Sequence, residues 1–300
     1  MFGRKEKRQK TTSDLVAMSR RNGQGREVLV RLTRNKIGMV GIFICLVLLV
    51  LCIGAPLFTH WNPYGQSVRD RFILPGREHI MGTDDFGRDI WARLLYGGRY
   101  SLLIAFGATC FSTFMGLILG SCAGFFGGKT DLIITRILDV IQAIPSLLMA
   151  IAISSALGSG PFKTMLAISM GGIASGARVM RATVMSIKNN EFVEAAKATG
   201  SRNARTIFVH ILPNTVAPLI INASMGIGGN ILAISGLSFI GLGVMPPTPE
   251  WGSILAVGKT YIRDFWPLVL VPALFIALTI FGFNLFGDAL RDALDPKLKD

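Results

Sequence analysis

Charged residues are scarce in this 300-residue chain. They make up 16% of it, whereas ordinary globular chains carry about 25%. Hydrophobic residues make up 51%, and the mean hydropathy is +0.51. So few charges cannot cover the surface of a soluble particle of this size, and lipid is therefore the expected solvent. The apolar content excludes intrinsic disorder, and the lack of a glycine period excludes a collagen-like chain.

The sequence also lacks the residue patterns of catalytic and metal sites. Its three histidines are dispersed, and no serine has a histidine and an aspartate in evident register. Residues 127–130 (GGKT) end like a phosphate-binding loop, but Ala123 stands where the first glycine is required. We therefore expect no catalytic residue, metal or cofactor in this chain. The four cysteines lie in apolar runs and are expected to be small buried hydrophobes; they are Cys45, Cys52, Cys110 and Cys122.

The net charge of +13 is compatible with nucleic acid, anionic lipid or membrane topology, and the location of the charges favours topology. Residues 1–36 hold eleven Lys/Arg against three acids, and an uncharged run follows at residues 37–58. About 20 apolar residues span a bilayer. The pattern predicts a basic tail and a first transmembrane helix. The end of the tail either lies along the membrane as an interfacial helix or is solvated.

Apolar runs predict an all-α integral membrane protein with six transmembrane helices. The expected helices are residues 37–58, 101–126, 132–157, 165–187, 215–237 and 265–287. The fourth is the weakest, because Arg178 and Arg181 fall within it. Pro145 is expected to kink the third.

The loop charges predict that both termini are cytoplasmic, because cytoplasmic loops are rich in Lys/Arg. This orientation places 22 of the 31 Lys/Arg inside and nine outside. It makes residues 59–99 an external loop, residues 100–288 a membrane core that contains a cytoplasmic segment at 188–214, and residues 289–300 a cytoplasmic tail.

The cytoplasmic segment predicts a short helix near Glu191–Lys197. Gly200 suits a left-handed C-terminal turn, and Pro213 allows a fresh helix to start a residue or two later. Composition alone leaves the role of this segment open, with an interfacial helix without a partner as the alternative.

The spacing within this segment is more specific. Glu194, Ala195, Ala196, Gly200, Leu212 and Pro213 follow the pattern EAA-x3-G-x9-I-x-LP. The segment therefore resembles the coupling motif of ABC-importer permeases, with His210 at the usual isoleucine position.

Three longer segments narrow the resemblance. They are residues 81–89 (MGTDDFGRD), 237–252 (LSFIGLGVMPPTPEWG) and 284–296 (NLFGDALRDALDP). From about residue 32 to 299, the chain resembles the second permease subunit of oligopeptide, dipeptide and nickel ABC importers, which have the type I ABC transmembrane fold.

The resemblance implies a bacterial or archaeal cytoplasmic membrane protein that forms half of a path for peptides. Its partners would be a homologous permease, two ATPases that bind ATP and Mg, and an external solute-binding protein. Glu191 and Glu194 would contact the ATPase, Ala195 and Ala196 would allow close packing, and Gly200 would make the turn. Nickel, glutathione or oligosaccharide as cargo stays open. An intramembrane enzyme and a nucleic-acid binder are disfavoured by the residue pattern.

The external segment at 81–89 has two interpretations. Asp84, Asp85, Arg88 and Asp89 either dock the solute-binding protein or have a structural role. In the structural interpretation Asp84 or Asp85 caps a helix that begins near Phe86, and Arg88 pairs with a nearby acid.

Other polar residues lie at membrane depth or at its boundary. Polar groups inside a bundle tend to face its interior, so Gln142, Ser146, Asn222, Ser224 and Asn230 are candidates for lining the path, with helix packing as the alternative. Residues 246–251 are expected to form a rigid external turn that puts Trp251 at the membrane interface.

Overall fold

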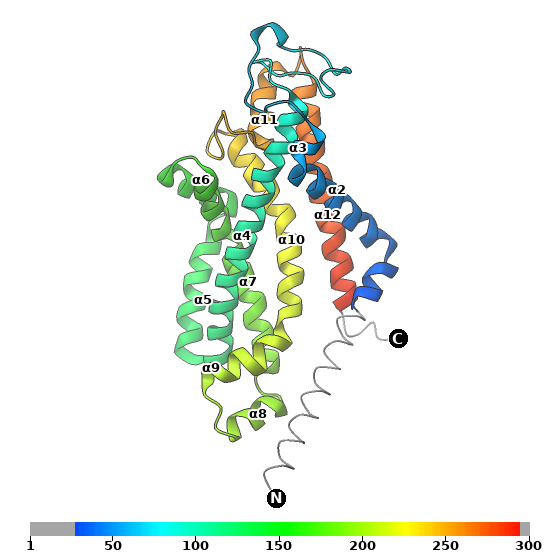
Figure 1. Ribbon diagram of the computed structural model, residues 1–300. Coiled ribbons are helices and arrows are strands. Elements are labelled where there is room, and N and C mark those ends of the chain that lie inside the picture. The colour runs from blue at the N-terminus through cyan, green and yellow to red at the C-terminus, as the bar shows by residue number, and fades with distance from the viewer. Residues whose placement is uncertain (1–27, 295–300) are drawn as a thin grey trace, which may run out of the picture.

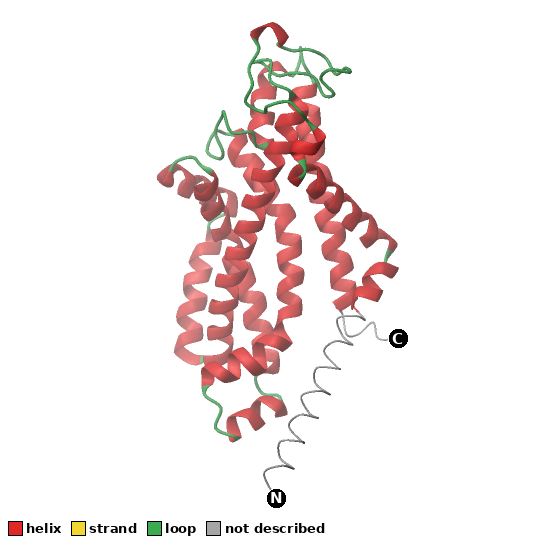
Figure 2. Ribbon diagram, viewed as in Figure 1, coloured by secondary structure: helices red, strands yellow, loops and turns green. Residues whose placement is uncertain are grey.

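The computed structural model describes residues 28–294, and these form helices joined by loops (Figures 1 and 2). Residues 28–34 are helical and run into Asn35, whose side chain caps the next helix by accepting from the Gly38 backbone N–H. The basic tail before residue 28 and the end of the C-terminal tail lie outside the described residues.

The elements follow in this order: α2 (Lys36–Ile53), α3 (Ala55–Phe58), the 3-10 turn η1 (Val68–Asp70), α4 (Ile90–Phe126), α5 (Gly128–Ala143), α6 (Ser146–Leu157), α7 (Pro161–Ile187), α8 (Glu191–Ala198), α9 (Asn203–Arg205), the π-helical segment η2 (Thr206–Ile211), α10 (Leu212–Phe239), α11 (Trp251–Gly258), the 3-10 turn η3 (Lys259–Tyr261) and α12 (Pro267–Leu294).

Four helices in the described residues are long and apolar enough to cross a membrane: α2, α4, the continuous helix Asn203–Phe239 and α12. The bent pair α5–α6 makes a fifth candidate. The remaining long helix, α7, has 27 residues but carries Arg178 and Arg181 in its second half. Length and hydropathy thus support four of the six expected crossings, or five if the bent pair is one span.

A sharp break separates α5 from α6. The sequence predicts one kinked helix over 132–157, whereas the structure has two helices that meet at 87°. Ile144 is extended, at φ −94° and ψ 126°, because the ring of Pro145 disfavours a helical conformation in the residue before it. Pro145 also lacks an N–H, so the helical hydrogen bonds cannot continue through it.

The long helix α4 packs closely along α7 (Figure 1). Its 37 residues span about 55 Å. Gly116, Gly120 and Gly124 face α7, and a Cβ at Gly120 would lie 2.4 Å from the Ala177 carbonyl oxygen. Small residues four apart let two helix backbones approach in this way.

The helix that leads into α10 begins twelve residues earlier than the expected start at residue 215. It starts at Asn203 and continues through η2 into α10. Pro213 occupies the first turn of α10, directly after the π-helical segment. We attribute the wider π turn to Pro213, whose ring would otherwise clash with a carbonyl one turn earlier.

Candidate functional site

The helix α8 packs against the rest of the protein through one face only. Val193 is fully buried and packs in an apolar cluster with Met180 and Val184 of α7 and Ile211 of η2. Ala196, one turn further along α8, is also buried. This face fixes α8 at one end of the molecule, below α7 and η2 in Figure 1.

The opposite face of α8 is open. Glu191, Glu194 and Ala195 are exposed, and both glutamates lie in the first turn. The positive end of the helix dipole stabilises negative charge at this position. The expected coupling residues of α8 therefore lie on two faces. Ala196 is on the buried face, whereas Glu191, Glu194 and Ala195 are on the exposed face.

A left-handed glycine ends α8. Gly200 has φ +80°, its N–H donates to the Lys197 carbonyl at 2.9 Å, and the Ser201 N–H donates to the Ala196 carbonyl at 3.1 Å. This pair of bonds is a Schellman motif. It confirms the expected C-terminal turn, and it leaves open space where a Cβ at Gly200 would point.

Two lysines tie this region to the end of α4. The Lys197 ammonium lies 5.4 Å from the centroid of the Phe125 ring. The Lys188 ammonium donates to the Gly124 carbonyl at 3.1 Å. These contacts connect α8, and the residue that ends α7, to the last turn of α4.

The rest of the expected coupling motif lies on η2 and α10. His210 and Leu212 are half-buried, and Leu212 packs against the apolar cluster that holds Val193. The His210 carbonyl accepts from the Asn214 side chain at 2.8 Å. Pro213 is exposed. The structure thus brings Leu212 close to the α8 seat, whereas Pro213 faces away from the cluster.

The two arginines of α7 are both paired with acids of α5. The Arg181 guanidinium donates to both carboxylate oxygens of Asp131, at 2.5 and 2.6 Å. Arg178 donates to Asp139 at 2.7 Å in a pair that is half exposed on both sides. Sequence analysis missed these partners because they lie 50 and 39 residues away.

The expected path residues do not gather in one place. Gln142 and Ser146 line a pocket at the break between α5 and α6. On α10, Asn222 is half-buried, and Ser224 is buried where α10 meets Gly287 of α12. Asn230 donates to the Thr109 hydroxyl of α4 at 2.9 Å. The Ser224 and Asn230 contacts are helix-packing contacts.

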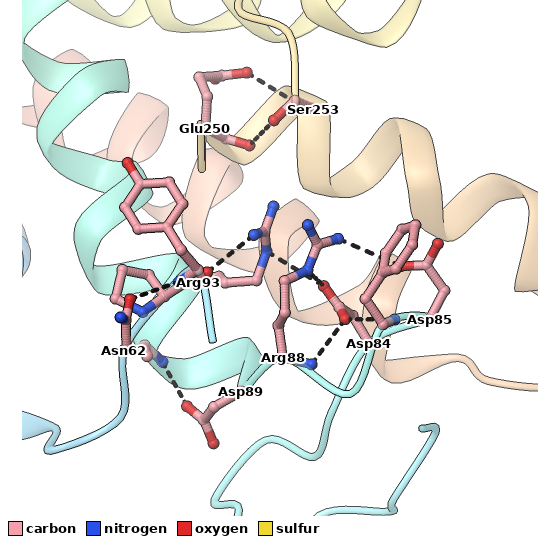
Figure 3. A network of polar contacts seen from close by, with 12 residues as sticks. Asn62, Asp84, Asp85, Arg88, Asp89, Arg93, Glu250 and Ser253 are labelled. Carbon is pink, nitrogen blue, oxygen red and sulfur yellow. Dashed lines mark hydrogen bonds and ion pairs between the residues drawn. The ribbon is translucent and has the colours of Figure 1, made fainter. Parts of the chain in front are cut away.

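At the other end of the molecule, residues 59–89 and α11 form what we call the cap, whose centre is a buried ion-pair network (Figure 3). The Asp84 carboxylate accepts from Arg88 Nε at 2.6 Å and lies 3.4 Å from Arg93 Nε. It also accepts the backbone N–H groups of Phe86 and Arg88. All three charged residues are at most 3% exposed. The network holds residues 84–88 against the start of α4.

Asp85 is the weaker partner in this network. Its carboxylate lies 3.5 Å from Arg88 Nη2. Burial, and then the neighbouring Asp84 charge, raise the pKa of Asp85 above its usual value.

The N-cap residue of α4 is Asp89, so the expectation that Asp84 or Asp85 caps a helix at Phe86 is wrong. One Asp89 oxygen accepts the Ala92 N–H at 2.6 Å, and the other is 2.8 Å from His79 Nδ1. The reason is backbone geometry: Gly87 at φ +71° still turns the chain, and the helix starts only at Ile90. Residues 90–99, expected in the external loop, are therefore helical.

Trp251 is fully buried, so its expected place at the membrane interface is wrong. Its indole N–H donates to the Leu94 carbonyl of α4 at 2.9 Å. The adjacent Glu250 is also fully buried; it accepts from the Ser101 hydroxyl and caps α11 at the Ser253 N–H, both at 2.9 Å. Their partners on α4 lie 149 and 157 residues away, so sequence analysis could not find these contacts.

Metal ligands are not grouped in the described residues: no three of His, Cys, Asp and Glu lie close enough together to hold an ion. His79 and Asp89 are a pair only, and Asp89 serves as the N-cap residue of α4.

Two family models match the chain. The binding-protein-dependent transport system inner membrane component covers residues 116–300, and the N-terminal transmembrane domain of oligopeptide transport permease C covers residues 23–75.

Curated relatives match most of the chain. The dipeptide transport system permease protein DppC of Alkalihalophilus pseudofirmus is 42% identical over 91% of this chain and 90% of its own length. The di/tripeptide transport system permease protein DppC of Pseudomonas aeruginosa is 39% identical, over 89% of this chain and 90% of its own. The oligopeptide transport system permease protein OppC of Bacillus subtilis is 36% identical, over 91% and 90%.

The fold is similar to a solved structure of the MetNI methionine ABC transporter, with a TM-score of 0.55 at 15% identity, over 67% of this chain and 96% of that chain. From the family models and the curated relatives together, the chain belongs to the binding-protein-dependent transport system inner membrane component family, in its oligopeptide and dipeptide permease C branch.

Proposed function

We propose that this chain is the second permease subunit of an ATP-driven peptide importer. The observation that carries the proposal is α8: a helix seated through Val193 and Ala196 that presents Glu191, Glu194 and Ala195 to a partner. The relatives named for dipeptide and oligopeptide transport support peptides as cargo.

The proposed topology has six crossings with both termini cytoplasmic. Successive long helices run in alternating directions between the cap and the α8 end (Figure 1). α7 supplies the remaining crossing, which is the fourth in chain order. Asp131 and Asp139 neutralise the two arginines that lower its suitability as a span. The excess of Lys/Arg on the α8 side supports placing that side in the cytoplasm.

In this arrangement, a cytoplasmic ATPase binds the exposed face of α8. The ATPase pair binds ATP and Mg, and this chain contributes no catalytic group. ATP shifts the transporter between states only through its differential affinity for the closed ATPase pair. Lys197 and Lys188 would pass the resulting displacement to α4.

The other partners follow from the two remaining surfaces. A homologous permease completes the path to which Gln142, Ser146 and Asn222 contribute, with Ser224 and Asn230 holding the helices that form it. The extracytoplasmic solute-binding protein docks on the cap. Because Asp84, Arg88 and Asp89 are buried, they shape this surface without touching the receptor, while Asp85 lies nearer to it.

Co-purification in detergent tests the proposal. Two ATPases, a sister permease and a receptor should accompany the chain, and the ligand in the receptor should be a peptide. Nickel, glutathione or an oligosaccharide in that receptor would leave the architecture intact and contradict the cargo. A purified chain that moves solute without an ATPase would contradict the function.

A double substitution tests the role of α8. Glu194→Lys with Gly200→Asp should leave membrane insertion unchanged and uncouple uptake from ATP hydrolysis. Normal uptake by this variant would contradict the assignment.

A further inference from the structure

A pocket of about 310 Å³ lies beside α4 where the cap begins, and none of its residues takes part in the proposed transport function. It is lined by Tyr64, Tyr96, Arg99, Tyr100, Leu103 and Pro161. Three tyrosines and one arginine form its polar part, and a leucine and a proline form its apolar part.

The arginine keeps free donors toward this pocket. Arg99 Nε donates to the Cys52 carbonyl and Arg99 Nη2 to the Ile53 carbonyl, each at 2.7 Å. A guanidinium has five N–H groups, so three remain. In residues 28–294, none of the ion pairs joins Arg99 to a carboxylate.

The contacts of Arg99 place the pocket at the edge of the membrane. Cys52 and Ile53 end α2, which is the most apolar candidate span, with a hydropathy of 2.8. The guanidinium also lies 4.7 Å from the centroid of the Tyr96 ring. Tyrosines gather at the level of lipid headgroups, where one end of the ring is apolar and the hydroxyl is wet.

Exposed apolar residues continue from the pocket toward the membrane interior. Leu103, two turns of α4 beyond Tyr96, is 67% exposed, and Ile53 beside the guanidinium is 69% exposed. Tyr64, on the cap side, is a neutral donor at physiological pH, and burial and then Tyr100 raise its pKa further. Polar donors above an apolar wall match the two halves of a phospholipid.

We propose that this pocket binds the phosphate headgroup of an anionic phospholipid. The free N–H groups of Arg99 and the tyrosine hydroxyls donate to the phosphate and glycerol oxygens, and one acyl chain lies over Leu103 and Ile53. The bound lipid would bridge the end of α2 to α4, next to the cap.

Native mass spectrometry of the full importer tests this site, with phosphatidylglycerol and phosphatidylcholine of the same acyl chains as probes. We expect one phosphatidylglycerol to be retained about tenfold more tightly than phosphatidylcholine, because its charge-assisted hydrogen bonds face no competing choline. Arg99→Gln should abolish this preference. Arg263→Gln, which removes an exposed arginine at the same end of the molecule, is the matched control and should retain it.

A second variant guards against misfolding, since Arg99 also holds the end of α2. Tyr96→Phe with Tyr100→Phe keeps every ring and should weaken phosphatidylglycerol retention by about threefold. Equal retention by the wild type and both variants, or equal retention of the two lipids, would overturn the proposal. Displacement of the lipid by inorganic phosphate at equal concentration would also overturn it, because it would show a site for free anions.

Discussion

The Lys197 ammonium of α8 lies 5.4 Å from the centroid of the Phe125 ring, which stands at the last turn of α4. At the other end of α4, Asp89 is the N-cap residue. Its second carboxylate oxygen contacts His79, which belongs to the cap formed by residues 59–89 and α11. One helix of about 55 Å therefore joins the element that we assign to the ATPase to the surface that we assign to the receptor.

The buried side chain of α8 should hold this element in place. Val193→Ala removes two methyl groups from a fully buried site, and we expect it to lower the free energy of unfolding by roughly 2 kcal/mol. Uptake per ATP hydrolysed should fall as well, because α8 would be less firmly attached to α7 and η2. Glu194→Ala, on the open face of α8, is the control for stability and should change the free energy of unfolding by less than about 0.5 kcal/mol.

The left-handed turn at Gly200 should tolerate few side chains. Gly200→Ala meets no neighbouring atom but adopts φ +80°, and we expect it to cost about 1–2 kcal/mol of stability. Gly200→Asn should cost less, because asparagine visits this conformation more readily. Gly229→Ala, also in open space but without a positive φ, should not destabilise the protein. Equal effects of the two alanine substitutions on the thermal midpoint in detergent would refute the argument from φ.

The two ion pairs between α5 and α7 should differ in strength. Arg181 binds Asp131 through two hydrogen bonds in a partly buried site, whereas Arg178 and Asp139 share one bond and are half exposed. In double-mutant cycles measured by thermal unfolding, we expect a coupling of about 1–2 kcal/mol for the first pair and less than about 1 kcal/mol for the second. A larger coupling for Arg178 with Asp139 would contradict this order.

Stability near the cap should depend on pH through Asp85. Its folded pKa is raised, so its contribution to stability is present below the unfolded pKa, near 4, and is lost as pH rises through the folded pKa. Asp85→Asn should therefore be at least as stable as the wild type at pH 7, with the difference shrinking toward pH 4.

The matched variant Asp84→Asn should behave in the opposite way. It removes the charge that two buried arginines share, and it should destabilise the cap by about 3–5 kcal/mol at pH 7. If thermal unfolding between pH 4 and 8 showed Asp85→Asn to be the more damaging of the two, Asp84 would not be the main charged partner of Arg88 and Arg93.

Sequence patterns predicted the features that local chemistry determines. Long apolar runs predicted the main helices, and Gly200 predicted the end of α8, because a left-handed glycine turn depends on one residue. The start of α4 was placed eleven residues too late, since Arg93 and Arg99 looked like loop charges. Their partners, Asp84 and the carbonyls that end α2, lie elsewhere in the chain.

The remaining errors have the same physical origin. Trp251 is buried because the Leu94 carbonyl, 157 residues away, accepts its N–H. No local pattern contains that contact. Pro145 predicted a kink, but the 87° angle depends on how α5 and α6 pack against α7.

The most direct test of the central claim is site-specific disulfide or thiol crosslinking from α8 in the assembled importer. Ala195→Cys lies on the open face of α8 and should capture an ATPase subunit, whereas Val68→Cys, exposed on the cap, should capture none. Capture of the solute-binding protein by Ala195→Cys, or its labelling only from the extracellular side, would contradict the account.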